Sequence, residues 1–466
     1  MFFKLLHNHL RLPVLLLMLA ELGVIYGAVF VAAGFRSHGD LAVFEMPEGP
    51  IWPKAAIVTL VVFVAILALG LYQFHQRLYF KDTLARMGVA FLLASFPLTA
   101  VWYSLPELAL SRGIAQLAIV IAFAGLISIR LFFMRTVDEN IFRRRTLVYG
   151  AGAKSAAIHQ IRRRADRRGF RLVGSVSARG DASVFASGRL LDHNKSLLDI
   201  AVEKHVEEIV VAMDDRRGNL PVDELLTCKV RGIDVLDLAA FLERETGKVR
   251  IDLVTPGWLI FSSGFRITPI RRTTKRMLDL AGGVLALLVA WPFMLLSAIA
   301  IKVGDGLHAP VLYRQRRVGI HGEIFNVLKF RSMIEGAEAD GEARWAEEND
   351  LRITRAGAAL RKLRFDELPQ IFNVLRGEMS LVGPRPERPE FVSELTRSIP
   401  FYNERHTVKP GITGWAQLKY QYGSCQHDAI EKLQYDLYYV KNHSLLLDVV
   451  IMLQTAEVIL WGKGAR

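Results

Sequence analysis

Four long apolar segments occupy the first 142 residues of the chain. They cover residues 12–35, 51–74, 84–105 and 114–134. Each approaches or exceeds the ~20 residues that a helix needs to cross the hydrocarbon core of a bilayer. Because a lipid-exposed backbone must satisfy its polar groups internally, such segments fold as helices. The sequence therefore predicts a multidomain membrane protein that begins with an α-helical four-span transmembrane bundle over residues 1–142.

Charged residues between these segments give the bundle an orientation. Basic residues lie at three places. Lys4 and Arg11 precede the first segment, Arg77, Lys81 and Arg86 cluster between the second and third, and Arg143, Arg144 and Arg145 follow the fourth. The two other connections are mainly acidic, with Asp40, Glu45, Glu48 and Glu107. The positive-inside rule then places both ends of the bundle in the cytoplasm. A cleaved signal peptide is the alternative for the first segment, but no clear small-residue cleavage site follows it.

One charge lies deep inside an apolar segment. Arg130 belongs to the fourth segment, where a charge is costly and often functional. Snorkelling of its side chain toward the cytoplasmic edge is the structural alternative, and we expect this alternative.

The composition indicates which partners to expect. The formal net charge of +13 could suggest nucleic acid, but the basic residues flank apolar segments, so an anionic lipid surface is the simpler partner. Hydrophobic residues make up 52% of the chain, which is unusual for a soluble enzyme. The two cysteines, Cys228 and Cys425, lie far apart and predict neither a disulfide framework nor a cysteine zinc site.

Residues 143–256 alternate between strand and helix patterns. Strands are predicted at 146–149, 171–176, 208–212 and 234–236, and helices near 197–203 and 222–230. This alternation predicts an α/β Rossmann-like cytoplasmic domain with a parallel, doubly wound sheet. The turn Gly150-Ala-Gly152 is similar to a dinucleotide fingerprint. However, Ser155 replaces the third glycine and no acidic residue ends the second strand, so nucleotide binding stays open.

The last part, residues 257–466, opens with a fifth apolar run at 278–301. Basic residues lie on both sides of it, which disfavours a crossing, and Pro292 near its middle bends a helix. We therefore expect a re-entrant membrane helix over residues 275–303 that enters and leaves through one face. Asp279 would be costly in such a helix unless it pairs, and Arg276 is the expected partner.

Two adjacent carboxylates mark the candidate site. Asp366 and Glu367 stand before an apolar run at helical spacing, so Asp366 is predicted to be a helix N-cap with Glu367 in the first turn. A helix N-terminus favours negative charge and also suits a phosphate. Four arginines lie nearby in the sequence: Arg361, Arg364, Arg376 and Arg385. Ordinary helix capping is the alternative interpretation of the acid pair.

Further cations are predicted to face a phosphorylated ligand. Strand alternation puts Lys329 and Arg331 on one face, Arg314 belongs to a basic strand just before them, and the stiff turn Gly383-Pro-Arg385-Pro presents Arg385. Arginine fits phosphate oxygens well. The alternative is a solvated basic face against lipid head groups. The acidic segment 335–350 could act as a lid, and 445–461 fits a helix that lies on the membrane or packs against the core.

The stretch 361–386 resembles the monotopic phosphoglycosyl transferases, together with Lys329-Phe-Arg-Ser-Met333 before it and Pro410-Gly-Ile-Thr-Gly-Trp415 after it. The resemblance covers about residues 274–461. It implies an α/β monotopic catalytic domain that transfers a sugar 1-phosphate from a UDP-sugar to membrane polyprenyl (undecaprenyl) phosphate with Mg²⁺. It further implies that Asp366 is the nucleophile, that Glu367 with Asp366 holds the metal, and that the helix break, usually Ser-Pro, is here Trp291-Pro292.

The resemblance also implies the setting of the enzyme. Longer members of the family have a membrane bundle and a Rossmann-like module, which suggests that this module serves for homodimer contacts or for regulation. The family also implies a location at the cytoplasmic face of a bacterial inner membrane. Phosphate-binding roles then belong to Lys329, Arg331, Arg364, Arg385 and Arg314. Two rival interpretations remain: an oxidoreductase or epimerase of sugar nucleotides that uses the Gly150 turn, and a non-catalytic membrane scaffold.

Overall fold

A computed structural model describes most of the chain. The described residues are 12–36, 49–69, 71–72, 80–136, 143–159, 161, 169–178, 190–191, 195–215, 219–254, 264–265, 268–334, 336, 352–420 and 426–461. Several residues used above lie outside these ranges, namely Lys4, Arg11, Asp40, Glu45, Glu48, Arg77, Cys425 and the proposed lid 335–350 apart from Gly336. The chain divides into two compact units, Met1–Thr246 and Gly247–Arg466.

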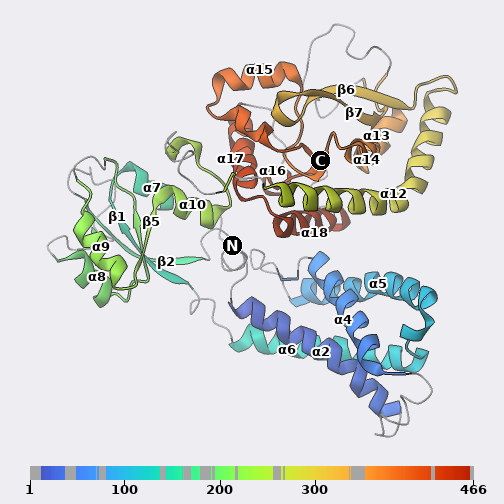
Figure 1. Cartoon of the computed structure of the whole chain (residues 1–466), viewed down its shortest axis with the longest axis horizontal. Coiled ribbons are helices and arrows are strands. Elements are labelled where there is room, and N and C mark those ends of the chain that lie inside the picture. The colour runs from blue at the N-terminus through green and yellow to red at the C-terminus, as the bar shows by residue number, and fades with distance from the viewer. Residues whose placement is uncertain are drawn as a thin grey trace. The chain divides into compact units, whose positions relative to one another are not determined.

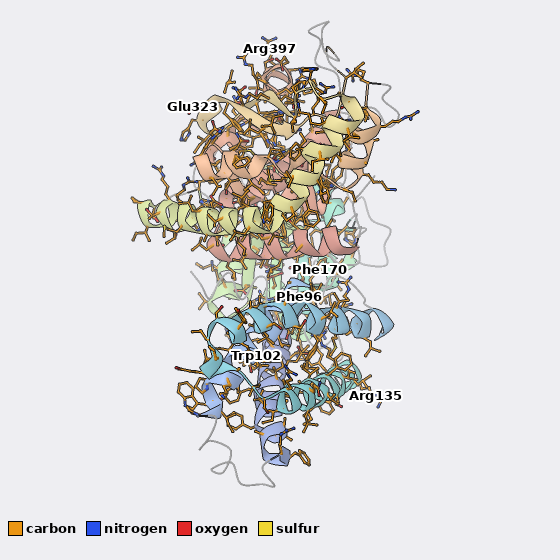
Figure 2. All side chains as sticks on the ribbon, turned by 90° about the vertical axis from the view of Figure 1, so that its right-hand side faces the viewer. Phe96, Trp102, Arg135, Phe170, Glu323 and Arg397 are labelled. Atoms are coloured by element: carbon orange, nitrogen blue, oxygen red, sulfur yellow. The ribbon has the colours of Figure 1, made fainter. Side chains whose placement is uncertain are left out.

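The first unit begins with an apolar helical region. Its long helices are α2 (Leu12–Arg36), α4 (Ile51–Ala68), α5 (Phe80–Ser104) and α6 (Arg112–Thr136), with the short η1 (Pro106–Leu108) between the last two. Helix α2 packs against α4 and α6, and α4 packs against α5 (Figure 1). All four are long and apolar enough to cross a membrane. Large apolar side chains also remain exposed on them, such as Phe96 on α5 (Figure 2). The prediction of four long apolar helices is therefore confirmed, although α4 ends at Ala68, earlier than expected.

A buried ion pair connects these helices, and the expected snorkelling of Arg130 is wrong. The Nε atom of Arg130 on α6 lies 2.6 Å from Oε1 of Glu21 on α2, and Glu21 is fully buried. The Tyr72 hydroxyl also donates to Glu21, and Arg130 donates to the Leu71 carbonyl at 3.1 Å. Because a charge in an apolar bundle is costly unless it is paired, Glu21 provides the counterion that lets Arg130 stay inside.

The first unit continues with a parallel α/β sheet. Its strands are β1 (Arg144–Tyr149), β2 (Phe170–Val176), β3 (Leu190–Leu191), β4 (Glu208–Val211) and β5 (Asp234–Asp237). Their order is β3-β2-β1-β4-β5, and every pair is parallel. The accompanying helices are α7 (Ala153–His159), α8 (Leu197–Glu203), α9 (Val222–Val230) and α10 (Leu238–Thr246). The strand and helix positions predicted from alternation are confirmed to within about two residues.

The second unit is built on helix α12 (Pro269–Asp305). Figures 1 and 2 both show this helix turning sharply between two halves, and Pro292 lies inside it. Proline removes one backbone hydrogen bond and bends a helix. One turn beyond the proline, the Ser297 hydroxyl donates to the Phe293 carbonyl at 2.7 Å. This is the usual bond of a helical serine to the carbonyl four residues earlier, and it lies just beyond the bend.

The rest of the second unit packs around α12. An antiparallel hairpin joins β6 (Leu312–Val318) to β7 (Ile324–Phe330), and a parallel pair joins β8 (Ser380–Val382) to β9 (Gly411–Thr413). The remaining elements are η2 (Ile251–Leu253), η3 (Ile320–Gly322), α13 (Arg355–Lys362), η4 (Phe365–Glu367), α14 (Gln370–Arg376), α15 (Pro389–Ser398), η5 (Tyr402–Thr407), α16 (Trp415–Lys419), α17 (Gln426–Asn442) and α18 (Leu445–Trp461). Helix α18 packs against the core through Leu447 and Ile451, which is one of the two expected alternatives.

The start of the second unit differs from the predicted domain boundary at residue 257. The Trp415 indole donates to the Gly247 carbonyl at 2.7 Å, and the Val249 amide donates to the Gln434 carbonyl at 3.0 Å. Residues 247–254 therefore pack within the second unit. The division into domains 1–142, 143–256 and 257–466 stays a prediction.

Asp279 on α12 is paired, but not with Arg276 as expected. Its Oδ1 atom accepts hydrogen bonds from the Ser380 hydroxyl at 2.9 Å and the Leu381 amide at 3.1 Å, and lies 3.5 Å from Lys275 Nζ. Arg276 instead donates to the Val374 and Leu375 carbonyls at the end of α14. Since the last carbonyls of a helix lack partners within the helix, an arginine satisfies them well. The first half of α12 thus fixes both β8 and α14.

Candidate active site

The acid pair lies in a tight turn, and the prediction that Asp366 caps a helix is wrong. Asp366 and Glu367 belong to η4, whereas α14 begins at Gln370 with Pro369 as its N-cap. Arg364 enters the turn with a left-handed backbone (φ 56°). The Phe365 ring packs 5.3 Å from the Phe293 ring, next to the bend of α12. The turn that carries both carboxylates is therefore held against the bent region of the apolar helix.

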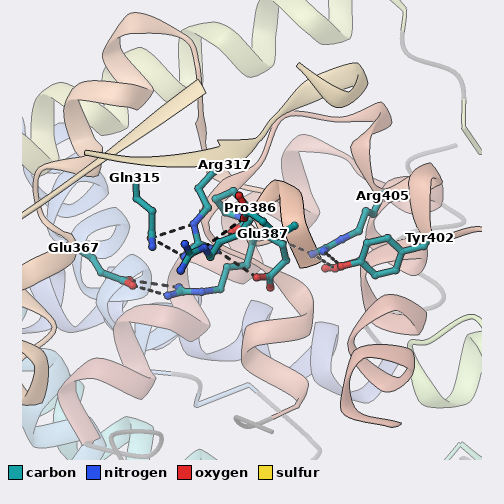
Figure 3. Close-up of polar contacts among 11 residues, drawn as sticks. Gln315, Arg317, Glu367, Pro386, Glu387, Tyr402 and Arg405 are labelled. Carbon is teal, nitrogen blue, oxygen red and sulfur yellow. Dashed lines mark hydrogen bonds and ion pairs between the residues drawn. The ribbon is translucent and has the colours of Figure 1, made fainter. Parts of the chain in front are cut away.

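Glu367 forms the central ion pair of the site. Its Oε1 atom lies 2.6 Å from Nη2 of Arg385, and its Oε2 atom accepts from Nη1 at 3.5 Å (Figure 3). Burial alone would raise the pKa of Glu367, but the charges of Arg385 and Lys329 outweigh it and lower the pKa to about 2. Glu367 is therefore a carboxylate at every working pH.

Asp366 is in a different electrostatic state from its neighbour. Burial and the adjacent Glu367 charge raise the pKa of Asp366, while the charges of Lys329, Arg361 and Arg385 oppose this shift. The pKa of Lys329 is shifted downward instead, because burial lowers it to about 8. Two acids whose pKa values move apart beside a poorly solvated lysine are typical of a catalytic site.

The β6–β7 hairpin supplies the cations on one side of the site. Residues that pair across an antiparallel hairpin share a face, and Lys329 pairs with Tyr313, so Gln315 and Arg317 lie on the face of Lys329. Arg317 donates to Gln315 Oε1 at 2.8 Å, to the Pro386 carbonyl at 3.1 Å and to Glu387 Oε2 at 3.4 Å (Figure 3). Its charge acts on Lys329.

The five cations predicted to bind phosphate fall into two groups. Lys329, Arg364 and Arg385 all act electrostatically on Glu367. Arg331 lies 3.7 Å from Asp305 at the end of α12, and Arg314 is exposed on the opposite face of the hairpin from Lys329. The structure therefore brings three of them together with the acid pair.

Arg317 is the site residue that sequence reasoning left out. The basic run 314–317 contains three arginines, and only the pairing register with β7 shows which of them shares a face with Lys329. The sequence does contain part of this information, because alternation along the strand places Arg314 and Arg316 on one face and Arg317 on the other.

The donor set at the acid pair fits a hard divalent cation. Mg²⁺ prefers carboxylate oxygens and commonly keeps waters and substrate phosphates in its shell. Within the described ranges no cluster of three or more acidic, histidine or cysteine side chains exists that could hold a metal alone. Asp366 and Glu367 are adjacent carboxylates, so they would provide two protein ligands and leave the other positions to phosphate and water.

The loop Pro410–Trp415 contacts the Arg385 turn and supports it. The Gly383 amide donates to the Thr413 carbonyl at 2.9 Å, and the Gly411 amide donates to the Pro384 carbonyl at 2.9 Å. A Cβ atom on Gly383 would collide with the Lys409 carbonyl. Trp415 is buried and stacks on Tyr438. Glycine is therefore required where the two backbones meet.

The glycine turn of the first unit is occupied by the protein's own carboxylate. Asp214, which follows β4, accepts hydrogen bonds from the Ala153 and Lys154 amides, both at 2.8 Å. A side chain on Gly152 would clash with the same carboxylate. These amides are the groups that would cradle a dinucleotide phosphate. A phosphate would have to displace Asp214, which weighs against the oxidoreductase interpretation.

Comparison with known proteins places the chain in a family. A protein-family model with the description bacterial sugar transferase matches residues 270–462. The chain is 43% identical over 52% of its length to the UDP-N-acetylgalactosamine-undecaprenyl-phosphate N-acetylgalactosaminephosphotransferase of Aeromonas hydrophila, of which it spans 56%. It is 33% identical over 69% of its length to the undecaprenyl-phosphate glucose phosphotransferase of Komagataeibacter xylinus, of which it spans 60%.

A third relative aligns over most of both chains. This is the UDP-glucose:undecaprenyl-phosphate glucose-1-phosphate transferase of Escherichia coli (strain K12), which is 31% identical over 86% of this chain and 87% of its own length. The matched family model covers α12, the acid pair and the Arg385 turn, which together form the site described above. The chain belongs to the bacterial sugar transferase family.

Proposed function

We propose that the chain transfers a sugar 1-phosphate from a UDP-sugar to polyprenyl (undecaprenyl) phosphate, giving a polyprenyl-diphosphate sugar and UMP. The observation that carries this proposal is the acid pair, set among Lys329, Arg317 and Arg385 and held against a bent apolar helix. Such a site presents a nucleophile and several cations to a diphosphate. The same reaction is supported by the names of two relatives, which give a UDP-sugar and undecaprenyl phosphate as their substrates.

The chemistry follows from the charges of the site. The Asp366 carboxylate attacks the phosphorus that bears the sugar, the bond from this phosphorus to the UMP oxygen breaks, and UMP leaves with that electron pair. An oxygen of polyprenyl phosphate then attacks the phosphosugar-aspartate and restores the carboxylate. Lys329, Arg317 and Arg385 would neutralise the transferring phosphate, and arginine does so with paired donors.

Mg²⁺ is proposed as the cofactor. Asp366 and Glu367 would hold it, and it would neutralise phosphate charge that otherwise repels the approaching carboxylate. Glu367 suits this task because its low pKa, about 2, keeps it ionised.

We infer that the site lies at the cytoplasmic face of the inner membrane. The bend of α12 at Pro292 supports a re-entrant helix over residues 275–303, which would hold the acid pair where a water-soluble donor and a lipid acceptor meet. The strand order of the first unit fits a Rossmann-like domain. Contacts of that domain in a homodimer are a further part of this proposal.

One assay tests the function directly. The purified full-length protein is incubated with undecaprenyl phosphate, Mg²⁺ and each of a panel of UDP-sugars, and UMP is measured. We expect UMP to form with at least one UDP-sugar only when the enzyme is present, and lipid-linked sugar phosphate to form in equal amount. Release of UDP instead of UMP would show a different transferase reaction and contradict the proposal.

The hairpin register predicts which arginine matters. Arg317→Gln removes a cation from the face of Lys329, and we expect kcat/KM for the UDP-sugar to fall ~10- to 100-fold, as for loss of a charged hydrogen bond. Arg314→Gln changes an exposed side chain on the other face and should stay within about twofold of the wild type. Steady-state UMP release measures both. Equal losses in the two variants would contradict the assignment of Arg317 to the site.

A further inference from the structure

The turn that presents Arg385 is held at its first end by buried polar groups. The Val382 carbonyl, immediately before Gly383, accepts a hydrogen bond from Lys275 Nζ at 3.2 Å, and the hydroxyl oxygens of Tyr439 and Ser380 each lie 3.0 Å from it. The single proton of each hydroxyl is shared with a nearby carboxylate, Asp448 for Tyr439 and Asp279 for Ser380. Lys275 belongs to α12 and Tyr439 to α17. One carbonyl thus joins the proposed membrane helix to the start of the turn.

A second cation holds the other end of the same turn. Nη2 of Arg405 donates to the carbonyl of Arg385 itself at 2.9 Å and to Asp436 at 2.8 Å, while Nη1 donates to the Tyr402 hydroxyl at 2.7 Å (Figure 3). The Arg405 side chain is only 5% exposed. It contacts the site through the Arg385 backbone, and its charge also acts on Glu387, the acid beside Arg317.

Each of these cations has its own buried acid. Lys275 Nζ lies 2.8 Å from Asp448, which also accepts from Tyr439 at 2.7 Å, and Arg405 pairs with Asp436. A buried ion pair rarely adds stability over an apolar pair of the same size, because both charges lose their hydration. Two such pairs, one beside the Val382 carbonyl and one beside the Arg385 carbonyl, therefore point to another reason, and fixed geometry is the one that the contacts support.

The turn has little freedom to adjust by itself. Gly383 and Gly411 approach so closely that a Cβ atom on either would collide with the other strand's backbone, and Pro384 and Pro386 restrict the backbone on both sides of Arg385. A shift at either carbonyl is therefore transmitted to the Arg385 side chain, which forms the 2.6 Å contact with Glu367. An error of about 1 Å in such a contact can cost about 100-fold in rate.

We propose that Lys275 and Arg405 are positioning residues that act through Arg385. Lys275 fixes the Val382 carbonyl from the membrane helix, and Arg405 fixes the Arg385 carbonyl from η5. This inference rests on the proposed function, in which Arg385 contacts the donor diphosphate. It also gives α12 a role in catalysis besides anchoring, because its first half sets one end of the turn.

Double-mutant cycles test this proposal. The full-length variants are Arg385→Ala, Arg405→Gln and Lys275→Met, with Arg385→Ala combined with each of the others. The readouts are kcat/KM for UMP release and the Kd for UDP by calorimetry, so that positioning is measured with and without turnover. We expect Arg405→Gln and Lys275→Met each to lower kcat/KM ~10-fold, and each double variant to match Arg385→Ala within about twofold.

Controls separate positioning from loss of structure. Lys248→Met removes a lysine that is paired with Glu431 at 2.7 Å elsewhere in the same unit, and it should leave kcat/KM unchanged. Arg405→Lys keeps a cation beside Asp436 and should recover part of the lost rate. If Lys275→Met fails to fold, Tyr439→Phe replaces it, because this variant removes the hydroxyl that lies 3.0 Å from the Val382 carbonyl. Melting temperatures identify variants that fold.

The outcomes distinguish this inference from the function on which it rests. Double variants whose losses multiply would overturn the positioning role, even where the wild type releases UMP normally. A wild type that binds UDP but releases no UMP would contradict the proposed function, and the cycles in Kd would still decide the positioning role. A wild type that does not bind UDP would overturn both.

Discussion

Asp366→Asn is expected to reduce UMP release by at least about 1000-fold. Asparagine has nearly the shape of aspartate but no anionic oxygen to attack phosphorus, so the first step of the proposed exchange is lost. The measurement is UMP formed from the active UDP-sugar, with and without undecaprenyl phosphate. Without acceptor, the wild type should release UMP in a burst of at most one per enzyme, and the variant should show no burst.

The same substitution should not destabilise the protein. Burial raises the pKa of Asp366, so its contribution to the free energy of unfolding is fully present below the unfolded pKa and is lost as the pH rises through the folded pKa. Above that folded pKa the carboxyl therefore contributes nothing to stability, and asparagine removes its charge. We expect a melting temperature equal to or above that of the wild type.

The outcomes for Asp366 are easily separated. Full activity of a well-folded Asp366→Asn variant would refute its role as nucleophile. An inactive variant that still gives the acceptor-independent burst would place the nucleophile elsewhere. Glu387→Gln is a matched control, since Glu387 is an acid beside Arg317 at 3.4 Å and is not proposed to attack phosphorus. It should retain the burst.

The elements of this protein could be predicted where periodicity decides them. The helices α8 and α9 coincide with the predicted ranges because apolar residues recur at helical spacing between clear turn signals. The apolar helices were predicted from the length and composition of their segments, since a helix of ~20 apolar residues satisfies its own backbone in lipid.

Partners across the fold could not be predicted in the same way. Arg276 is the nearest basic residue one turn from Asp279, yet the two do not pair. Arg276 bonds a carbonyl of α14, and Asp279 accepts from Ser380 of β8. Arg130 was expected to reach water because the sequence does not show that Glu21 lies beside it. That position depends on how α2 packs against α6. Local sequence carries no information on such pairings.

The candidate site shows the same limit on a finer scale. The motifs identified Lys329, Arg385 and the acid pair because these residues are spaced within short, recognisable turns and strands. The choice of Arg317 over Arg314 required the hairpin register, and the contact of Arg331 with Asp305 required the end of α12. Arg405 carried no signal of its own, because its role depends on a backbone carbonyl twenty residues earlier in the chain.

Glu367→Gln is the second substitution with a large expected effect. Glutamine keeps the shape but loses the charge that pairs with Arg385 at 2.6 Å and that would bind Mg²⁺. Removing one partner of a buried pair leaves the other uncompensated, at a cost of about 3–5 kcal/mol, which corresponds to a fall in kcat/KM of ~10²- to 10⁴-fold if the whole cost appears in the transition state. The concentration of Mg²⁺ that gives half-maximal activity should also rise.

A second readout tests whether Glu367 acts on Lys329 as the electrostatics indicate. The Glu367 charge raises the pKa of Lys329, which burial lowers to about 8, so its loss should lower that pKa further. The protonated fraction of Lys329 then falls at a given pH, and the alkaline limb of the pH–rate profile should move to lower pH. Glu387→Gln should leave both this limb and the Mg²⁺ titration in place. If Glu367→Gln keeps the wild-type titration and the wild-type limb, Glu367 is neither the metal ligand nor the group that keeps Lys329 charged.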